Sequence, residues 1–323
     1  MKNFYYLHNG RSALDLALIN LNLKSNDEIL YPEYSCDVIF QHNKKRIYNY
    51  QFYKTKSNFS ISIDYLKERI TSKTKVIVII NFFGIKQNLK TLYKFCKKNK
   101  ILLFLDECHT YYNLYHSSDN DCDVKFFSPS KIFDRLNNYG ILQVNNHRIK
   151  ITKNIKIIKK KIILLSILKK RIKDSNFYDK YKFAKKRPKY EDQNFFKSKY
   201  DVKNFIYDEK SIIKIKLLDI KKENKLRIKN FKFWKLVCKK LKIKPIINLN
   251  VIKHGCPLYF PAICKSYKEA IKIYDLGWKN NVEIISWPTL HMNQKKNKRL
   301  IKNWGRHVYF PMEKNYFVRK DIL

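Results

Sequence analysis

Acidic residues, glycine and proline are scarce in this chain of 323 residues. It has 27 Asp and Glu against 69 Lys and Arg, a formal net charge of +42, with 6 glycines and 8 prolines. Such an excess of positive charge is typical of nucleic-acid-binding proteins. However, the basic residues are spread through the chain together with abundant Ile, Asn and Tyr, and they form no recognisable nucleic-acid-binding motif. We therefore interpret the charge as compositional drift, predict no nucleic-acid partner, and rank a basic nucleic-acid-binding protein last.

Paired cysteines and long apolar runs are also missing. The 7 cysteines are scattered and include no C-x-x-C pair, so we expect neither a disulfide framework nor a metal site. The first residues contain no signal-peptide segment, and every apolar run is short and interrupted by lysine. Hydrophobic residues still make up 45% of the chain, enough for a globular core. We predict a cytoplasmic protein with no membrane span.

The first half of the chain alternates between apolar, β-branched runs and amphipathic segments. Strands are expected at residues 28–32, 76–84, 101–105, 124–127 and 140–144, and helices at residues 12–22, 61–70 and 88–98. Parallel strands that are buried on both faces have such continuous apolar runs, and helices connect them. The alternation predicts an α/β fold with a mostly parallel central sheet between helices.

The second half is more helical and ends in short strands. We expect a Lys- and Ile-rich helix at residues 149–172, an irregular segment at 173–210 and a second helix at 211–241. Short apolar segments at 257–261, 282–288 and 307–311 flank a helix at 267–280. We predict a large domain of residues 1–240, with the helical connector at 149–241, and a small C-terminal α+β domain of residues 241–323.

Two strand ends carry charged side chains. The run Leu103–Leu105 ends in Asp106, and the run Phe126–Phe127 is followed by Ser128 and Lys131. An acid and a lysine at one edge of a sheet suit pyridoxal phosphate, which needs a lysine amine for its Schiff base and a carboxylate beside its ring nitrogen. Taken singly, each residue has an ordinary explanation as a solvated, capping or turn residue. Their order and spacing together favour the cofactor.

The sequence also offers candidate residues to bind the phosphate and the ring oxygen of the cofactor. Its phosphate suits a helix N-terminus, and Gly10, Arg11 and Ser12 form a turn that opens an apolar-periodic helix. Ser128 is a hydroxyl donor for the same phosphate, and His109 is a polar neighbour for the 3-oxygen of the ring.

These segments resemble the DegT/DnrJ/StrS-type sugar aminotransferases, which are fold-type-I enzymes dependent on pyridoxal phosphate. The resemblance covers most of the chain and is weakest from about 150 to 250. It rests on five segments in the first 131 residues and two near the C-terminus: Gly10–Leu18, Asp27–Tyr34, Phe82–Gly84, Leu105–His109, Phe127–Lys131, Pro257–Pro261 and Ser286–Pro288. It implies that Asp106 pairs with the ring nitrogen, His109 lies near the ring oxygen, Ser128 binds phosphate and Lys131 forms the Schiff base. Lysine at position 131 disfavours the dehydratase branch of the family, which has histidine there.

The resemblance further implies a reaction and partners. Lys131 and Asp106 would be the catalytic residues of an aminotransferase that moves an amino group from glutamate or glutamine to a keto-sugar. The acceptor is expected to be nucleotide-linked and to serve cell-surface polysaccharide or amino-sugar biosynthesis. Because fold-type-I sites form between two subunits, a homodimer is implied.

The chain departs from the family pattern at three places. Where many relatives stack an aromatic side chain on the cofactor ring this chain has Cys36, with Tyr34 nearby, and both are candidates for that contact. The segment after the lysine has residues 137–140 in place of a Gly-Gly pair, and an N-terminal segment of the family is missing. These departures leave open a catalytically degenerate homologue that binds the cofactor or serves as a scaffold.

Overall fold

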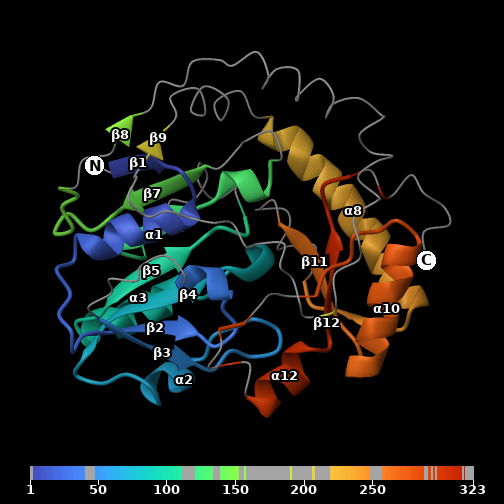
Figure 1. The fold of residues 1–323 in the computed structure, drawn as a ribbon, viewed down its shortest axis with the longest axis horizontal. Helices are drawn as coiled ribbons and strands as arrows, with labels where there is room; N and C mark the ends of the chain where they lie inside the picture. Colours follow the sequence, from blue (N-terminus) through green and yellow to red (C-terminus); the bar gives the residue numbers. More distant parts are fainter. Residues whose placement is uncertain are drawn as a thin grey trace.

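The structure is a computed structural model, and it describes most of the chain. The described residues are 3–40, 48–110, 121–133, 139–152, 156–157, 190, 206–207, 219–247, 257–286, 290–291, 294, 297–314 and 316. Figure 1 shows the N-terminal sheet and its helices beside a smaller group of C-terminal strands and helices.

A seven-stranded sheet forms the larger part. Its strands are β1 (Asn3–Leu7), β2 (Glu28–Pro32), β3 (Asn49–Tyr53), β4 (Thr74–Ile80), β5 (Leu102–Asp106), β6 (Val124–Phe127) and β7 (Gly140–Val144). They lie in the order β1-β7-β6-β5-β4-β2-β3. Strand β7 is antiparallel to both of its neighbours, whereas the other pairs are parallel. The predicted mostly parallel sheet is confirmed.

Helices cover both faces of this sheet (Figure 1). Helix α1 (Gly10–Ile19) packs on one face with Val76 and Val78, and helices α2 (Ile63–Lys67) and α3 (Leu89–Lys98) pack on the other with Ile77 and Ile79. Successive residues of a strand point to opposite faces, so an unbroken apolar run such as β4 supplies both cores.

The C-terminal part has its own core. It contains helices α8 (Ile220–Lys240), α10 (Tyr267–Lys279) and α12 (Lys298–Trp304) and an antiparallel sheet of β10 (Lys244–Pro245), β11 (Tyr259–Ile263) and β12 (His307–Pro311). Trp234 of α8 is fully buried, stacks on Phe310 with ring centroids 4.8 Å apart, and donates its indole N–H to the carbonyl of Pro311 at 2.7 Å.

An aromatic cluster joins the two parts. Tyr34, which follows β2, stacks on Trp304 of α12 with ring centroids 3.6 Å apart, and its hydroxyl hydrogen-bonds that of Tyr309 in β12. Beside this stack, Arg299 donates to buried Glu33 at 2.6 Å. Helix α12 is therefore held against the edge of the large sheet where β2 ends.

Several predicted elements differ from those observed. The helix expected from residue 149 is wrong at its start, because residues 149–152 are irregular and β8 (Lys156–Ile157) pairs in parallel with β9 (Ile206–Tyr207). The isoleucines alternate with polar residues here, which suits a strand as well as a helix. The second predicted helix is present from Ile220, and its earlier residues lie outside the described part. The boundary at residue 240 stays a prediction.

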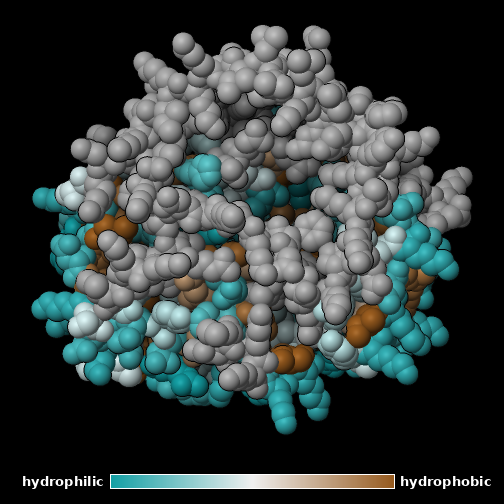
Figure 2. Space-filling view, viewed as in Figure 1, coloured by the Kyte–Doolittle hydropathy of each residue, from teal (hydrophilic) through white to brown (hydrophobic). Residues whose placement is uncertain are grey.

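The exposed face is mostly polar. In Figure 2 the described residues along the margins of the molecule are largely hydrophilic, with hydrophobic ones scattered among them. Among the described helices, none combines the length and the apolar character that a membrane crossing requires.

Candidate functional site

The ends of four parallel strands meet at one edge of the large sheet. Strands β2, β4, β5 and β6 all point the same way, so Tyr34, Asn81, Asp106 and Ser128 follow or end neighbouring strands there. Crevices outside the carboxyl ends of parallel strands are the usual ligand sites of α/β folds.

Asp106 is the last residue of β5 and is 5% exposed. Its Oδ1 accepts a hydrogen bond from the backbone N–H of Cys108 at 2.7 Å, which fixes the orientation of the carboxylate. Burial raises the pKa of Asp106 above its ordinary value, and the positive charge of Lys131 and the bond from Cys108 oppose that rise. A buried carboxylate of this kind is stabilised by a cationic partner.

Lys131 ends a 3-10 turn, η3 (Pro129–Lys131), directly after β6. The turn is closed by hydrogen bonds from Lys131 N to the carbonyl of Ser128 at 3.0 Å and from Phe133 N to that of Pro129 at 2.9 Å. The lysine side chain is exposed. Its charge acts on Asp106, Cys108, His109 and Cys36, which places these groups around it.

The predicted phosphate turn lies beside Ser128. Helix α1 begins at Gly10, and Asn9 caps it by accepting from the backbone N–H of Ser12 at 2.9 Å. A Cβ on Gly10 would lie 2.5 Å from the sulfur of Cys108 and 3.2 Å from Cβ of Ser128. Glycine thus lets the helix N-terminus approach the ends of β5 and β6. The side chain of Ser128 does not cap its own turn.

Of the two candidates for the contact with the cofactor ring, Tyr34 and Cys36 have different surroundings. One face of the Tyr34 ring is covered by Trp304, and its hydroxyl bonds Tyr309. Cys36 is half-buried, and burial raises the pKa of its thiol while the charges of Lys131 and Arg11 oppose the rise. The geometry favours Cys36 as the neighbour of a group held by Lys131.

His109 is buried against aromatic rings. Its ring centroid lies 5.2 Å from that of Phe83, which has a left-handed φ of 53°. The following Gly84 also has a positive φ, of 78°, and glycine adopts this conformation without strain. Burial, together with the charge of Lys131, holds the pKa of His109 well below its ordinary value. His109 is therefore a neutral imidazole near neutral pH, able to donate or accept one hydrogen bond per nitrogen.

The segment after the lysine is described only in part. Residues 137 and 138 lie outside the described residues, whereas Tyr139 is buried, with its ring centroid 6.2 Å from that of Tyr6. A Cβ on Gly140 would lie 2.0 Å from the carbonyl oxygen of Asn9. The glycine at position 140 is needed for that close approach of β7 to the start of α1.

These residues fit pyridoxal phosphate. A buried carboxylate that accepts hydrogen bonding from Cys108 lies within electrostatic reach of the lysine amine. The positive end of α1 and the hydroxyl of Ser128 lie together, as a phosphate requires. Neutral His109 lies within electrostatic reach of Lys131. The described residues contain no cluster of His, Cys, Asp and Glu that would hold a metal ion.

Sequence reasoning missed three contributors to this geometry. Asn9 caps α1, and its place directly before a glycine at a helix start is a signal that was available. Cys108 orients Asp106 through its backbone N–H, and that bond depends on the turn after β5 rather than on residue type. Arg227 is buried in α8 and donates to the carbonyl of Ile132, next to Lys131, and its long sequence separation gives no local signal.

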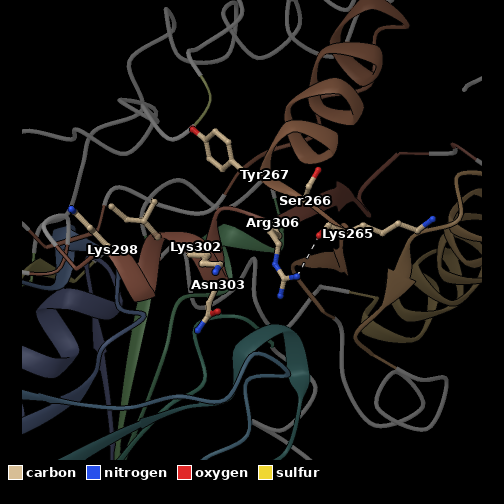
Figure 3. Close-up of a pocket in the computed structure, with 8 residues that line it drawn as sticks. Lys265, Ser266, Tyr267, Lys298, Lys302, Asn303 and Arg306 are labelled. Carbon is tan, nitrogen blue, oxygen red and sulfur yellow. Dashed lines mark hydrogen bonds between the residues drawn. The ribbon is translucent and has the colours of Figure 1, made fainter.

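A basic pocket lies away from this site. It has a volume of about 600 Å³ and lies between the start of α10 and α12, lined by Lys265, Ser266, Tyr267, Lys298, Ile301, Lys302, Asn303 and Arg306. In Figure 3 Arg306 bonds the carbonyl of Lys265, at 3.5 Å. Because Arg299 and Trp304 of the same helix contact Glu33 and Tyr34, the pocket is on another face of α12 and does not belong to the Lys131 site.

Comparison with known proteins agrees with this geometry. Residues 2–160 match the DegT/DnrJ/EryC1/StrS aminotransferase family. An assigned aspartate/prephenate aminotransferase of Aquifex aeolicus is 33% identical over 91 residues, a match that spans 26% of this chain and 21% of that relative. The chain thus aligns with about a fifth of the length of that curated relative.

Solved structures share the fold. Spr1654 of Streptococcus pneumoniae, assigned as a sugar aminotransferase, is similar in its PLP form with a TM-score of 0.64 and 15% identity, covering 96% of this chain and 82% of that one. NtdA of Bacillus subtilis with bound PMP has a TM-score of 0.62, 16% identity and coverages of 97% and 69%. PseC of Helicobacter pylori, an aminotransferase involved in pseudoaminic acid biosynthesis, has a TM-score of 0.60, 15% identity and coverages of 96% and 81%. The chain has the fold of these aminotransferases, and the match to their family indicates pyridoxal 5′-phosphate as the cofactor.

Proposed function

We propose that this chain, whose residues 2–160 match the DegT/DnrJ/EryC1/StrS aminotransferase family, is an aminotransferase that acts on a keto-sugar. The observation that carries the proposal is the meeting of Asp106 and Lys131 at one edge of the sheet, beside the start of α1. Pyridoxal phosphate, when bound, withdraws electrons from the Cα of an amino acid and so makes its proton acidic.

Each side chain of the candidate site has a separate proposed role. Lys131 would hold the cofactor through its amine, and the free amine would serve as the base that moves the proton at Cα of the amino donor. Asp106 keeps a proton on the ring nitrogen, for which its buried, oriented carboxylate is suited. His109, neutral and beside Phe83, supplies a hydrogen bond to the ring oxygen.

The phosphate has three contributors in this proposal. Gly10 and Ser12 belong to the first turn of α1, whose positive dipole end favours an anion, and the N–H and hydroxyl of Ser12 donate to Asn9 before a ligand binds. Ser128 adds a hydroxyl, and the guanidinium of Arg11, whose charge reaches Cys36, adds a cation on the same side.

For the substrates, we propose glutamate or glutamine as amino donor and a nucleotide-linked keto-sugar as acceptor. The formal charge of +42 favours approach of an anionic nucleotide-sugar. The solved relatives named as sugar aminotransferases support a sugar acceptor. A role in cell-surface polysaccharide or amino-sugar biosynthesis, a homodimer and a cytoplasmic location stay predictions.

The colour of the protein tests the proposal. Protein purified with pyridoxal phosphate should be yellow, and borohydride should abolish the visible absorbance and fix the cofactor to the peptide that contains Lys131. The variant Lys131→Ala should not be labelled. Lys298→Ala, which removes an exposed lysine of the separate basic pocket, is the matched control and should be labelled like the parent. A parent chain that takes up no cofactor refutes the proposal.

Catalysis is separated from binding by adding the donor. Glutamate or glutamine should convert the yellow form to the pyridoxamine form, and a keto-sugar nucleotide should restore the yellow form while the amino-sugar accumulates. A yellow protein that responds to no amino donor is instead the catalytically degenerate homologue.

A further inference from the structure

Arg227 is a charged residue in the interior of the protein. It lies in α8, is 1% exposed, and its Nε donates to Glu223 at 2.7 Å one turn earlier in the helix. A buried cation costs folding free energy unless a carboxylate and hydrogen-bond acceptors compensate it. The identity of those acceptors therefore indicates what the residue is for.

The guanidinium reaches two segments that are far apart in the sequence. Nη2 donates to the carbonyl of Ile132 at 3.1 Å, and Nη1 donates to the carbonyls of Pro257 at 2.5 Å and Leu258 at 3.4 Å. Ile132 directly follows Lys131. The planar fork of arginine presents donors in several fixed directions, which a single ammonium group does not do.

The second of these segments in turn holds His109. The backbone N–H of Leu258 donates to the carbonyl of His109 at 3.0 Å. The side chain of Arg227 thus connects the turn that bears Lys131 with residues 257 and 258. Through Leu258 it is also connected to His109, which follows a different strand from Lys131.

Helix α8 makes further hydrogen bonds that do not involve Arg227. Asn230, fully buried one turn later, donates to the carbonyls of Met312 at 2.8 Å and Lys314 at 2.6 Å, and Trp234 donates to Pro311 at 2.7 Å. These bonds anchor the helix to the C-terminal sheet. The bonds of Arg227 are directed toward the candidate site instead.

We infer that Arg227 is a positioning residue that sets the Lys131 turn relative to His109, so that the amine and the imidazole meet the same bound group. The purpose assigned to Arg227 rests on the proposed function, whereas its hydrogen bonds between the two segments are a property of the protein without cofactor. It adds a residue of α8, outside the region matched to the family, to the machinery of the site.

Amide hydrogen exchange on the cofactor-free protein tests whether Arg227 holds the two segments together. Arg227→Gln should speed exchange of the amides of residues 131–133 and of Leu258 by about tenfold, because local opening of the turn becomes easier. Asn230→Ala is the matched control, equally buried in the same helix, and should speed exchange near residues 312–316 while leaving the turn unchanged. The inference is overturned if the amides of the turn exchange at the wild-type rate in Arg227→Gln, or if Asn230→Ala speeds their exchange equally.

The cofactor-loaded protein gives the second readout. Arg227→Gln should release pyridoxal phosphate about tenfold faster than the parent and move the pH midpoint of its visible absorbance, whereas Asn230→Ala should keep the parent midpoint. Arg227→Lys keeps the charge beside Glu223 and should preserve the melting temperature better than Gln, yet it should not restore the midpoint. Restoration by lysine overturns the positioning role. If the parent chain takes up no cofactor, only the proposed function is refuted, because the exchange experiment still tests whether Arg227 holds the two segments together.

Discussion

Asp106 and Lys131 lie at the same edge of the large sheet, but they are held by different kinds of structure. Asp106 ends a central strand between β4 and β6, and its carboxylate is buried and oriented by a bond from Cys108. Lys131 ends a short turn after β6, and its side chain is exposed. The turn is held from outside the sheet, by Arg227 of α8.

This difference suits the work that each group is proposed to do. A carboxylate that pairs with a ring nitrogen serves best when it is fixed, because preorganised charge needs no rearrangement during reaction. An amine that binds a cofactor, leaves it and then moves a proton must change position, which an exposed side chain on a turn can do. The rigid side of the site should therefore contribute more to folding stability than the mobile side.

Lys131→Ala tests the mobile side and has the largest expected effect. Because the lysine both holds the cofactor and moves the proton, transamination should fall by at least about 10³-fold. The free energy of unfolding of the cofactor-free protein should fall by no more than about 1 kcal/mol, because the side chain is exposed and its charge is the main contribution lost, that to the buried Asp106 carboxylate. Assays with glutamate and urea unfolding measure the two quantities. A large loss of stability would show that the turn is part of the folding core.

Asp106→Asn tests the rigid side. The isosteric amide can still accept from Cys108, but it does not hold a proton on the ring nitrogen, so kcat should fall by about 10²- to 10³-fold. Burial raises the pKa of Asp106, so the folded chain binds this proton more tightly than the unfolded chain. The carboxylate therefore lowers stability increasingly as pH rises through that raised pKa.

Without cofactor, then, Asp106→Asn should melt higher than the parent, and the difference should grow from acidic toward neutral pH. Thermal melts of both proteins across that range, with Lys298→Ala of the separate basic pocket as the control, give the comparison. A variant that melts lower than the parent at neutral pH would mean that the Lys131 charge outweighs the desolvation of Asp106.

The same division explains how much of the structure could be predicted from the sequence. Strands β4, β5 and β6 are apolar runs whose length and composition are set by burial on both faces, so their ends, Asp106 and Ser128, could be located from the sequence. Strands β1 and β3 were missed because Asn3–Leu7 and Asn49–Tyr53 are polar, aromatic segments at the two edges of the sheet.

The supports of the lysine turn were harder to predict for a physical reason. The bonds of Arg227 to Ile132 and to Pro257 join residues that are 95 and 30 positions away. Such contacts depend on how α8 packs against both sheets, and neither periodicity nor a motif of one element contains that information. Tyr34 is similar, because its stacking on Trp304 depends on the placement of α12.

Gly10→Ala probes the close packing on the rigid side. The added Cβ would lie 2.5 Å from the sulfur of Cys108 and 3.2 Å from Cβ of Ser128, so the start of α1 and the turn after Asp106 must move apart. Overpacking of this kind typically costs about 1–3 kcal/mol. Urea unfolding measures the loss, and the double variant Gly10→Ala, Cys108→Ala should recover most of it because the sulfur is gone. Cys108→Ala alone is the control, and absence of recovery would point to Ser128 as the clash.

His109→Gln has the smallest expected effect and concerns pH. Burial and the charge of Lys131 hold the pKa of His109 well below its ordinary value, whereas the unfolded chain binds a proton at about pH 6.5. The unfolded state therefore gains protons first as pH falls, and the parent loses stability below that pH by up to about 1.4 kcal/mol per pH unit for this group. Burial also lowers the pKa of His307, to about 4, so parent and variant share that second contribution.

The parent should consequently lose more stability than His109→Gln between pH 7 and pH 5 in urea unfolding. At pH 8, kcat should change by less than about tenfold, because glutamine can still bond the ring oxygen. Equal pH slopes would place a proton on His109 in the folded state and remove the neutral imidazole from the proposed site.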